Sequence, residues 1–213
     1  GEGFDSVQLT DDFGGFVELS AVETVTGGDG DDVLTVVDGT FATIDGSDGF
    51  DEVILTDDFG GRVSVEDVER VTGGFGDDVL TVTDGTFATI GGGEGFDEVV
   101  LADGSGGTVL LEGEVEAVTG GFGFDTVQLG DEFNGVVELS GVEMALGGFG
   151  DDVLTVTDGT FATIDGGEGF DSVQLTDDFG GFVDLSAVEL ITGGDGDDVL
   201  TVTDGTFATI DGG

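Results

Sequence analysis

The segment GGDGDDVLT, from Gly27 to Thr35, decides the fold of this chain. Recognisable versions of it occur nine times, each built on glycines at set positions, then an aspartate, then a run of alternating apolar residues. The nine aspartates are Asp5, Asp32, Asp51, Asp78, Asp97, Asp125, Asp152, Asp171 and Asp198. Successive aspartates lie 27, 19, 27, 19, 28, 27, 19 and 27 residues apart, so the chain is an array with a period of 46 residues.

Long and short units alternate along this array. The first long unit is GEGFDSVQLTDDFGGFVELSAVETVT (1–26), and the first short unit is GGDGDDVLTVVDGTFATIDG (27–46). One short unit is missing after Thr119, and its neighbours are undisturbed, which is typical of a solenoid whose units contact only adjacent units. The sequence predicts a single array over residues 1–213. Its parts are the double units 1–46, 47–92, 120–166 and 167–212 and the long unit 93–119.

The composition and the local pattern favour an all-β fold. Hydrophobic residues make up 38% of the chain, which is more than a disordered acidic segment would carry. No proline interrupts a backbone hydrogen-bond ladder. The strict alternation after each motif aspartate is typical of strands. We therefore expect a parallel β-helix, or β-solenoid, of about nine coils with alternating long and short units.

Two inward positions after each motif aspartate suggest how the coils pack. Long units place valine and then leucine there, as at Val53 and Leu55, whereas short units place leucine and then valine, as at Leu34 and Val36. Stacked coils would then interleave large and small side chains and leave no voids. The eight extra residues of a long unit leave two possibilities open, a third strand or a projecting loop.

The net charge excludes several classes of partner. The chain has 49 acidic residues, two arginines, and neither lysine nor histidine, which gives a net charge of −47. Such a charge disfavours nucleic acids and anionic membrane surfaces as partners. Because self-repulsion opposes compaction, it favours bound metal ions, a high-salt milieu, or both.

The motif resembles a known family. GGDGDDVLT matches the pattern GGxGxDxUx, where U is a large apolar residue, of the RTX-type (hemolysin-type) calcium-binding β-helices. The segment LSAVETVTGG, from Leu19 to Gly28, is also similar to linkers in giant bacterial surface adhesins. The resemblance implies that calcium lies between the turns of neighbouring coils, bound by backbone carbonyls and by the motif aspartate. Flexible sites built only from oxygen atoms suit calcium.

The resemblance implies a set of metal-site residues, which includes the nine motif aspartates given above. The accompanying motif glycines are Gly28, Gly30, Gly74, Gly76, Gly121, Gly123, Gly148, Gly150, Gly194 and Gly196. The motif recurs every 19 or 27 residues here, whereas RTX repeats recur every nine. We therefore expect one calcium ladder along one edge, with at most eight interior sites. Long units carry phenylalanine before the aspartate, as at Phe50, which lowers the charge of those turns.

A simpler alternative is that the glycines only turn the chain and the aspartates cap their own turns through hydrogen bonds to the backbone. A second set of acidic turns, which includes Asp38, Asp84, Asp158 and Asp204, lacks the preceding glycine pair. Two roles are open for these turns, a second ladder of sites or a solvated turn, and we expect the solvated turn.

The 18 phenylalanines fall into recurring positions. Those of the TFATI segments, Phe41, Phe87, Phe161 and Phe207, are expected to stack inside the coil. Those of the acidic turns, Phe13, Phe59, Phe133 and Phe179, are candidates for an exposed apolar stripe through which rods pack side by side.

We expect no enzymatic activity, because a chain without Cys, His or Lys has few groups for nucleophilic or acid-base catalysis near neutral pH. The expected function is that of a structural extracellular or cell-surface protein, a calcium-stabilised shaft of an adhesin or a filament. The last residue, Gly213, begins a further long unit without a cap, so we expect a segment of a longer array or stacking of copies end to end.

Two alternative functions stay open. The first is a calcium-triggered folding module of a secreted RTX-like protein. The second is an ice-binding solenoid, which would need a regular outward row of threonine. The expected outward row is mixed, with Thr35, Thr81, Thr155 and Thr201 in short units but Gln8, Ile54, Val100, Gln128 and Gln174 in long units.

Overall fold

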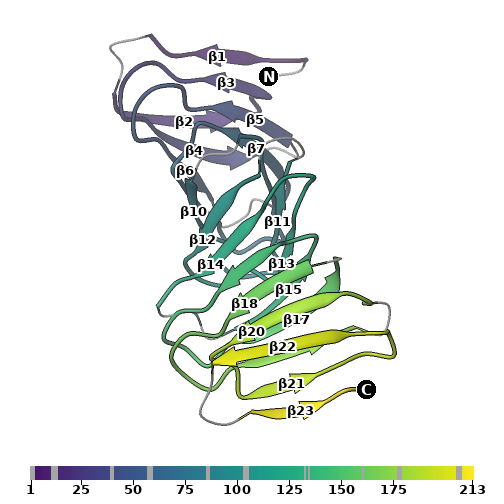
Figure 1. Ribbon diagram of the computed structural model, residues 1–213. Helices are drawn as coiled ribbons and strands as arrows, with labels where there is room; N and C mark the ends of the chain where they lie inside the picture. The colour runs from purple at the N-terminus through teal and green to yellow at the C-terminus, as the bar shows by residue number, and fades with distance from the viewer. Residues whose placement is uncertain are drawn as a thin grey trace.

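The chain winds into a parallel β-solenoid with two sheets (Figure 1). The computed structural model describes residues 3–10, 14–38, 41–56, 60–84, 87–102, 106–131, 133, 135–159, 161–176, 179–204 and 208–213. Every strand pairs in parallel with the strand two places before it, the strand two places after it, or both. The described residues form no helix, and so none that is long and apolar enough to cross a membrane.

The strands alternate between the two sheets, which we call the odd sheet and the even sheet. The odd sheet has 12 strands: β1 (Ser6–Gln8), β3 (Thr24–Thr26), β5 (Phe41–Asp45), β7 (Arg62–Glu66), β9 (Val79–Val82), β11 (Glu98–Leu101), β13 (Ala117–Thr119), β15 (Val136–Ser140), β17 (Val153–Asp158), β19 (Ser172–Leu175), β21 (Leu190–Thr192) and β23 (Thr209–Asp211). The even sheet has 11 strands: β2 (Phe16–Ser20), β4 (Val33–Asp38), β6 (Glu52–Leu55), β8 (Arg70–Thr72), β10 (Phe87–Gly91), β12 (Thr108–Leu111), β14 (Thr126–Leu129), β16 (Met144–Leu146), β18 (Phe161–Asp165), β20 (Phe182–Ser186) and β22 (Val199–Asp204).

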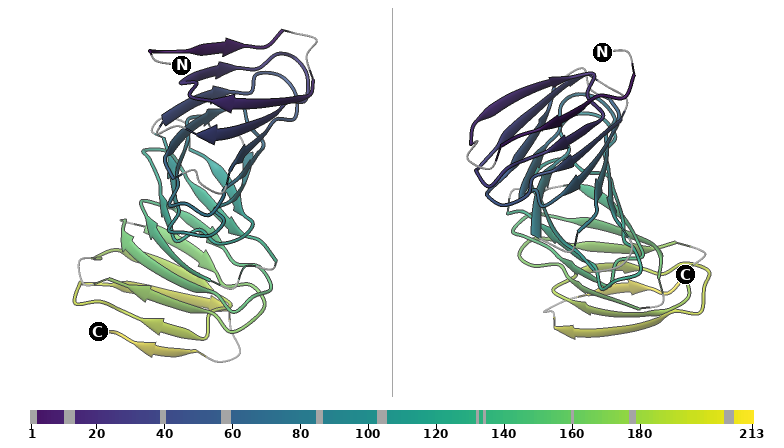
Figure 2. Two further views of the ribbon diagram at one scale, coloured as in Figure 1. Left: turned by 180° about the vertical axis from the view of Figure 1, so that it is seen from behind. Right: turned by 90° about the horizontal axis from the view of Figure 1, so that it is seen from above.

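The two ends of the chain lie at opposite ends of the stack (Figure 1). The strand direction turns progressively from β1 to β23, so the rod is twisted along its axis (Figure 2). Such a twist is the usual consequence of the handed geometry of individual strands.

Each long unit contributes three strands, and each short unit contributes two. The first long unit forms β1, β2 and β3, and the short unit after it forms β4 and β5. The extra residues of a long unit are therefore a third strand and not a projecting loop. Because a long unit fills one and a half coils, the solenoid has more turns than the nine that the motif count predicts.

A 46-residue double unit thus contains five strands, which is an odd number. Consecutive double units consequently begin in opposite sheets. The motif at Asp32 leads into β4 of the even sheet, whereas the equivalent motif at Asp78 leads into β9 of the odd sheet. This alternation decides where every motif lies.

The core confirms the predicted pairing of large and small side chains. Leu34 pairs with Val53 and Val36 pairs with Leu55 in the next coil, and all four are buried. The same arrangement recurs where β9 pairs with β11 and where β17 pairs with β19. Full burial of each such side chain contributes about 1.5–3 kcal/mol.

The phenylalanines lie opposite to the expectation. Phe41 and Phe87 are 49% and 48% exposed, because the alternating Ala and Ile of each FATI strand occupy the core. Phe133 and Phe179 are 5% and 1% exposed and pack inside. A Cβ on Gly135 would lie 3.0 Å from Cζ of Phe133, so this glycine makes room for the ring. Phe13, Phe59, Phe207 and the side chain of Phe161 lie outside the described part.

Candidate metal centre

The motif aspartates lie at the turns, immediately before the strands. Seven of them are at most 1% exposed: Asp32, Asp51, Asp78, Asp97, Asp125, Asp152 and Asp171. Asp5 and Asp198, in the outermost coils, are half-buried. Since charged side chains are rarely buried without compensation, these aspartates are the unusual feature of the molecule.

The motif aspartates line two edges of the solenoid and not one. Turns that lead into the odd sheet, the odd edge, carry Asp5, Asp78, Asp97, Asp152 and Asp171. Turns that lead into the even sheet, the even edge, carry Asp32, Asp51, Asp125 and Asp198. The expected single ladder along one edge is therefore wrong, and the reason is the odd number of strands in each long unit.

Several motif aspartates close their own turn or hold the neighbouring coil. Gly28 N–H donates to Oδ2 of Asp32 at 3.4 Å, and Gly121 N–H donates to Oδ2 of Asp125 at 2.8 Å. Asp32 N–H donates to Oδ1 of Asp51, one coil on, at 2.8 Å. Capping of the turns, the simpler of the two roles considered for these residues, is thus present. It does not use every oxygen of the carboxylates.

The phenylalanine before the aspartate in long units also has a place in these turns. Phe50 N–H donates to Oδ1 of Asp31 in the preceding coil at 2.9 Å. Phe96 N–H makes the same bond to Asp77, and Phe170 N–H makes it to Asp151. The outer acid of a short unit is therefore bonded to the backbone of a phenylalanine and does not lie against another acid at that position, which reduces like-charge repulsion between the coils. The rings themselves are more than half exposed.

The first glycine of the motif leaves a space that oxygen atoms fill. A Cβ on Gly46 would lie 2.6 Å from Oδ2 of Asp51, and closer still to the backbone carbonyl oxygen of Asp67 in the next coil. Gly92 and Gly166 show the same arrangement with Asp97 and Asp171. A carboxylate oxygen and a carbonyl oxygen, both hydrogen-bond acceptors, thus converge on one position that has no side chain.

The predicted site residues include the second and fourth glycines of the motif but not the first. The first glycines are Gly27, Gly46, Gly73, Gly92, Gly120, Gly147, Gly166 and Gly193. A signal was present in the sequence, because the first position is glycine in all eight of these motifs, whereas the second is serine at Ser47.

Burial shifts the ionisation of these carboxyls. Loss of solvation raises the pKa of Asp51, Asp78, Asp97 and Asp171 to about 6, and backbone N–H donors offset part of this rise. It also raises the pKa of Asp152. Oδ2 of Asp51, Asp97 and Asp171 is buried and accepts no hydrogen bond from the described residues. At neutral pH these aspartates carry desolvated and incompletely bonded negative charge, which is costly unless a cation lies nearby.

These groups fit the requirements of calcium. Calcium accepts carboxylate, backbone carbonyl and water oxygens in flexible geometry. Within the described ranges no three acidic side chains come together as a metal cluster, so each site would depend on one or two carboxylates and on carbonyls. The residues that would hold the ion are the motif aspartates and the backbone carbonyls packed over the first motif glycines.

The other sequence-predicted features lie at the surface. Asp38 is exposed and accepts hydrogen bonds from Ser20 Oγ and Ala21 N–H, as expected for a solvated turn. Thr35 pairs with Glu18 on one side and Ile54 on the other in the outward row, which is a mixed surface and not a threonine ladder.

Comparison with protein-family models, with curated proteins and with solved structures gives no match.

Proposed function

We propose that this chain is a calcium-stabilised structural β-solenoid of a cell surface or extracellular assembly, such as the shaft of an adhesin or the wall of a filament. One observation carries the proposal. At repeated turns, a buried aspartate oxygen without a hydrogen-bond partner converges with a backbone carbonyl oxygen on a vacant position. In a molecule with a net charge of −47, such oxygen pairs are sites where a divalent cation is strongly favoured.

Calcium is favoured over other cations by the donor set. Magnesium demands a nearly ideal octahedron and gives up its water reluctantly, and zinc prefers nitrogen and sulfur ligands. Turns composed of glycines offer only carbonyl and carboxylate oxygens. An extracellular location follows from this proposal, because only there is calcium abundant enough for weak sites of the extracellular class.

The calcium-triggered folding module is part of the same proposal. Without the cation, seven buried aspartates oppose folding, whereas with the cation they support it. Copies of the array would then stack coil on coil through the backbone groups of their outermost strands. The parallel pairing that joins every coil within the chain is the geometry such stacking would use.

The test is far-UV circular dichroism of the chain, first stripped with a chelator at low salt and then titrated with calcium. Parallel titrations with magnesium and sodium chloride separate specific binding from charge screening. We expect a transition from coil to β-structure at a calcium concentration where magnesium has little effect.

Complete β-structure in chelator that does not change with calcium would refute calcium stabilisation. An equal response to magnesium, or to sodium chloride of the same ionic strength, would also refute it, because screening of the −47 charge would then explain the result.

A further inference from the structure

A second kind of turn contacts the motif aspartates. Each long unit enters its third strand through a short turn ending in Val-Glu, which we call a Val-Glu turn. These turns are Ala21–Glu23, Asp67–Glu69, Glu114–Glu116, Gly141–Glu143 and Ala187–Glu189. They carry no glycine motif and are not among the predicted site residues.

Each Val-Glu turn places its glutamate beside a motif aspartate of the preceding coil. The N–H of Asp51 donates to Oε2 of Glu69 at 2.7 Å. The same bond joins Asp5 to Glu23, Asp97 to Glu116, Asp125 to Glu143 and Asp171 to Glu189, at 2.7–2.9 Å. Where two motif turns are neighbours, the equivalent N–H bonds a motif aspartate instead, as Asp32 N–H bonds Asp51. The glutamate therefore occupies the place of a motif aspartate in a turn without the motif.

The same turns supply a backbone carbonyl. The carbonyl oxygen that packs over Gly46 belongs to Asp67, two residues before Glu69. Over Gly92, Gly120 and Gly166 it belongs to Glu114, Gly141 and Ala187, each two residues before its glutamate. A motif aspartate, a carbonyl and a glutamate thus meet where a motif turn lies against a Val-Glu turn.

The charges at these places add to one another. The negative charge of Glu69 contributes to the raised pKa of Asp51, after the larger effects of burial and of the Asp32 contacts. Glu116 and Glu189 act in the same way on Asp97 and Asp171. Two carboxylates and a carbonyl oxygen gathered in a desolvated turn repel one another unless a cation lies between them.

We propose that the Val-Glu turn is the second half of a calcium site, and that its glutamate and its carbonyl complete the ligand set of the motif aspartate in the preceding coil. This inference rests on the proposed function. It adds ligands outside the glycine motif, namely Glu23, Glu69, Glu116, Glu143 and Glu189. It also places the motif aspartates that precede a Val-Glu turn in separate short columns, such as Asp32, Asp51 and Glu69, which end at a glutamate.

The test compares two variants with equal loss of charge. In the first, Glu69, Glu116 and Glu189 are changed to Gln. The amide oxygen of Gln can accept the same N–H bond, so the turn is retained while the charge is removed. In the matched control, the exposed residues Glu18, Glu66 and Glu138 are changed to Gln. Calcium bound per chain is measured by equilibrium dialysis and atomic emission, and folding is checked by circular dichroism in concentrated sodium chloride.

We expect the first variant to bind three calcium ions fewer per chain than wild type and the control to bind the same number as wild type. If the wild-type chain binds calcium and the first variant binds as many ions with the same affinity, the inference fails and the proposed function stands. If the wild-type chain binds no calcium, the proposed function fails and the inference fails with it.

Discussion

Oδ1 of Asp97 accepts a hydrogen bond of 2.9 Å from the backbone N–H of Asp78, the buried aspartate directly before it in the stack. One carboxylate thereby holds two coils together and is itself removed from water. In the metal-free solenoid, each such aspartate therefore has two opposing effects on stability. Its hydrogen bond to the next coil favours folding, and its desolvated charge disfavours folding.

Metal-free protein should be more stable in mild acid than at neutral pH. The folded-state pKa of about 6 for Asp51, Asp78, Asp97 and Asp171 lies above the ordinary value of 3.8, so the folded chain binds more protons than the unfolded chain between these values. The free energy of unfolding should therefore fall as the pH rises from 4 to 6 and should not recover above 6. Urea unfolding in chelator at a series of pH values measures this.

In saturating calcium the free energy of unfolding should instead rise as the pH rises from 4 to 6, because protons and the cation compete for the carboxylates. A metal-free protein whose stability rises between pH 4 and 6 would contradict the burial of unpaired charge.

The effect of Asp97→Asn on stability should depend on calcium. The amide oxygen can still accept the Asp78 N–H, while the buried charge is removed. In chelator at neutral pH we expect a gain of about 1–3 kcal/mol in the free energy of unfolding. With calcium present, the variant should gain less stability than wild type from the ion. Asp184→Asn, on an outward-facing position of β20, is the control and should show neither effect. Calorimetric unfolding with and without calcium distinguishes the two.

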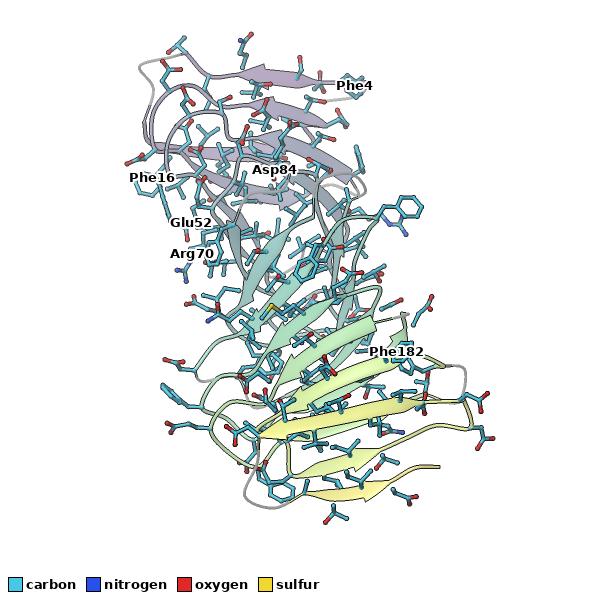
Figure 3. The ribbon with its side chains drawn as sticks, in the orientation of Figure 1. Phe4, Phe16, Glu52, Arg70, Asp84 and Phe182 are labelled. Atoms are coloured by element: carbon cyan, nitrogen blue, oxygen red, sulfur yellow. The ribbon has the colours of Figure 1, made fainter. Side chains whose placement is uncertain are left out.

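Two phenylalanines should respond to truncation in opposite ways. Phe179 is 1% exposed, so Phe179→Ala should cost about 3–5 kcal/mol of stability. Phe122 is 90% exposed, so Phe122→Ala should stay within about 0.5 kcal/mol of wild type. Denaturant unfolding in the presence of calcium measures the stability of both variants. Equal losses of stability would mean that Phe179 is not a core residue. Figure 3 shows that Phe16 and Phe182, which begin their strands, also project away from the ribbon.

Ala187→Gly should stabilise the chain. Ala187 begins a Val-Glu turn with φ of 50°, and the equivalent residue Gly141 has φ of 64°. Left-handed backbone costs alanine about 1–2 kcal/mol, which exceeds the entropy cost of glycine, so a net gain of about 0.5–1 kcal/mol is expected. Ala117→Gly, within β13, should instead destabilise. Thermal unfolding of both variants gives the comparison, and a loss of stability in Ala187→Gly would contradict the assignment of this strain.

Local patterns predicted much of the fold because each is written within a few residues. The alternation after each aspartate predicted the strands, and the exchange of Val and Leu predicted that Leu34 would pack on Val53. The number of strands in a long unit was not predictable, since eight extra residues fit a strand or a loop equally well. The edge on which each motif lies depends on that number. The sequence therefore could not predict that the motif aspartates lie along two edges.

Only part of the site could be predicted from the sequence, because the rest depends on how the strands pair. The motif itself indicated Asp51, but Glu69 belongs to a turn with no motif and meets Asp51 only through the register of β6 and β8. The direction of a phenylalanine likewise depends on its neighbours. Phe41 faces outward because Ala42 and Ile44 face inward, although an aromatic side chain by itself suggests the core.

The different strand counts of the two units affect how such a gene can change length. Gain or loss of a short unit by unequal recombination adds or removes two strands, a whole coil, and leaves every later residue on its original edge. Gain or loss of a long unit adds or removes three strands and moves all later residues to the opposite edge. The missing short unit after Thr119 is of the first kind. The array can therefore change length by whole short units while each later segment keeps its place on the same edge. We expect related genes to differ mainly in their number of short units.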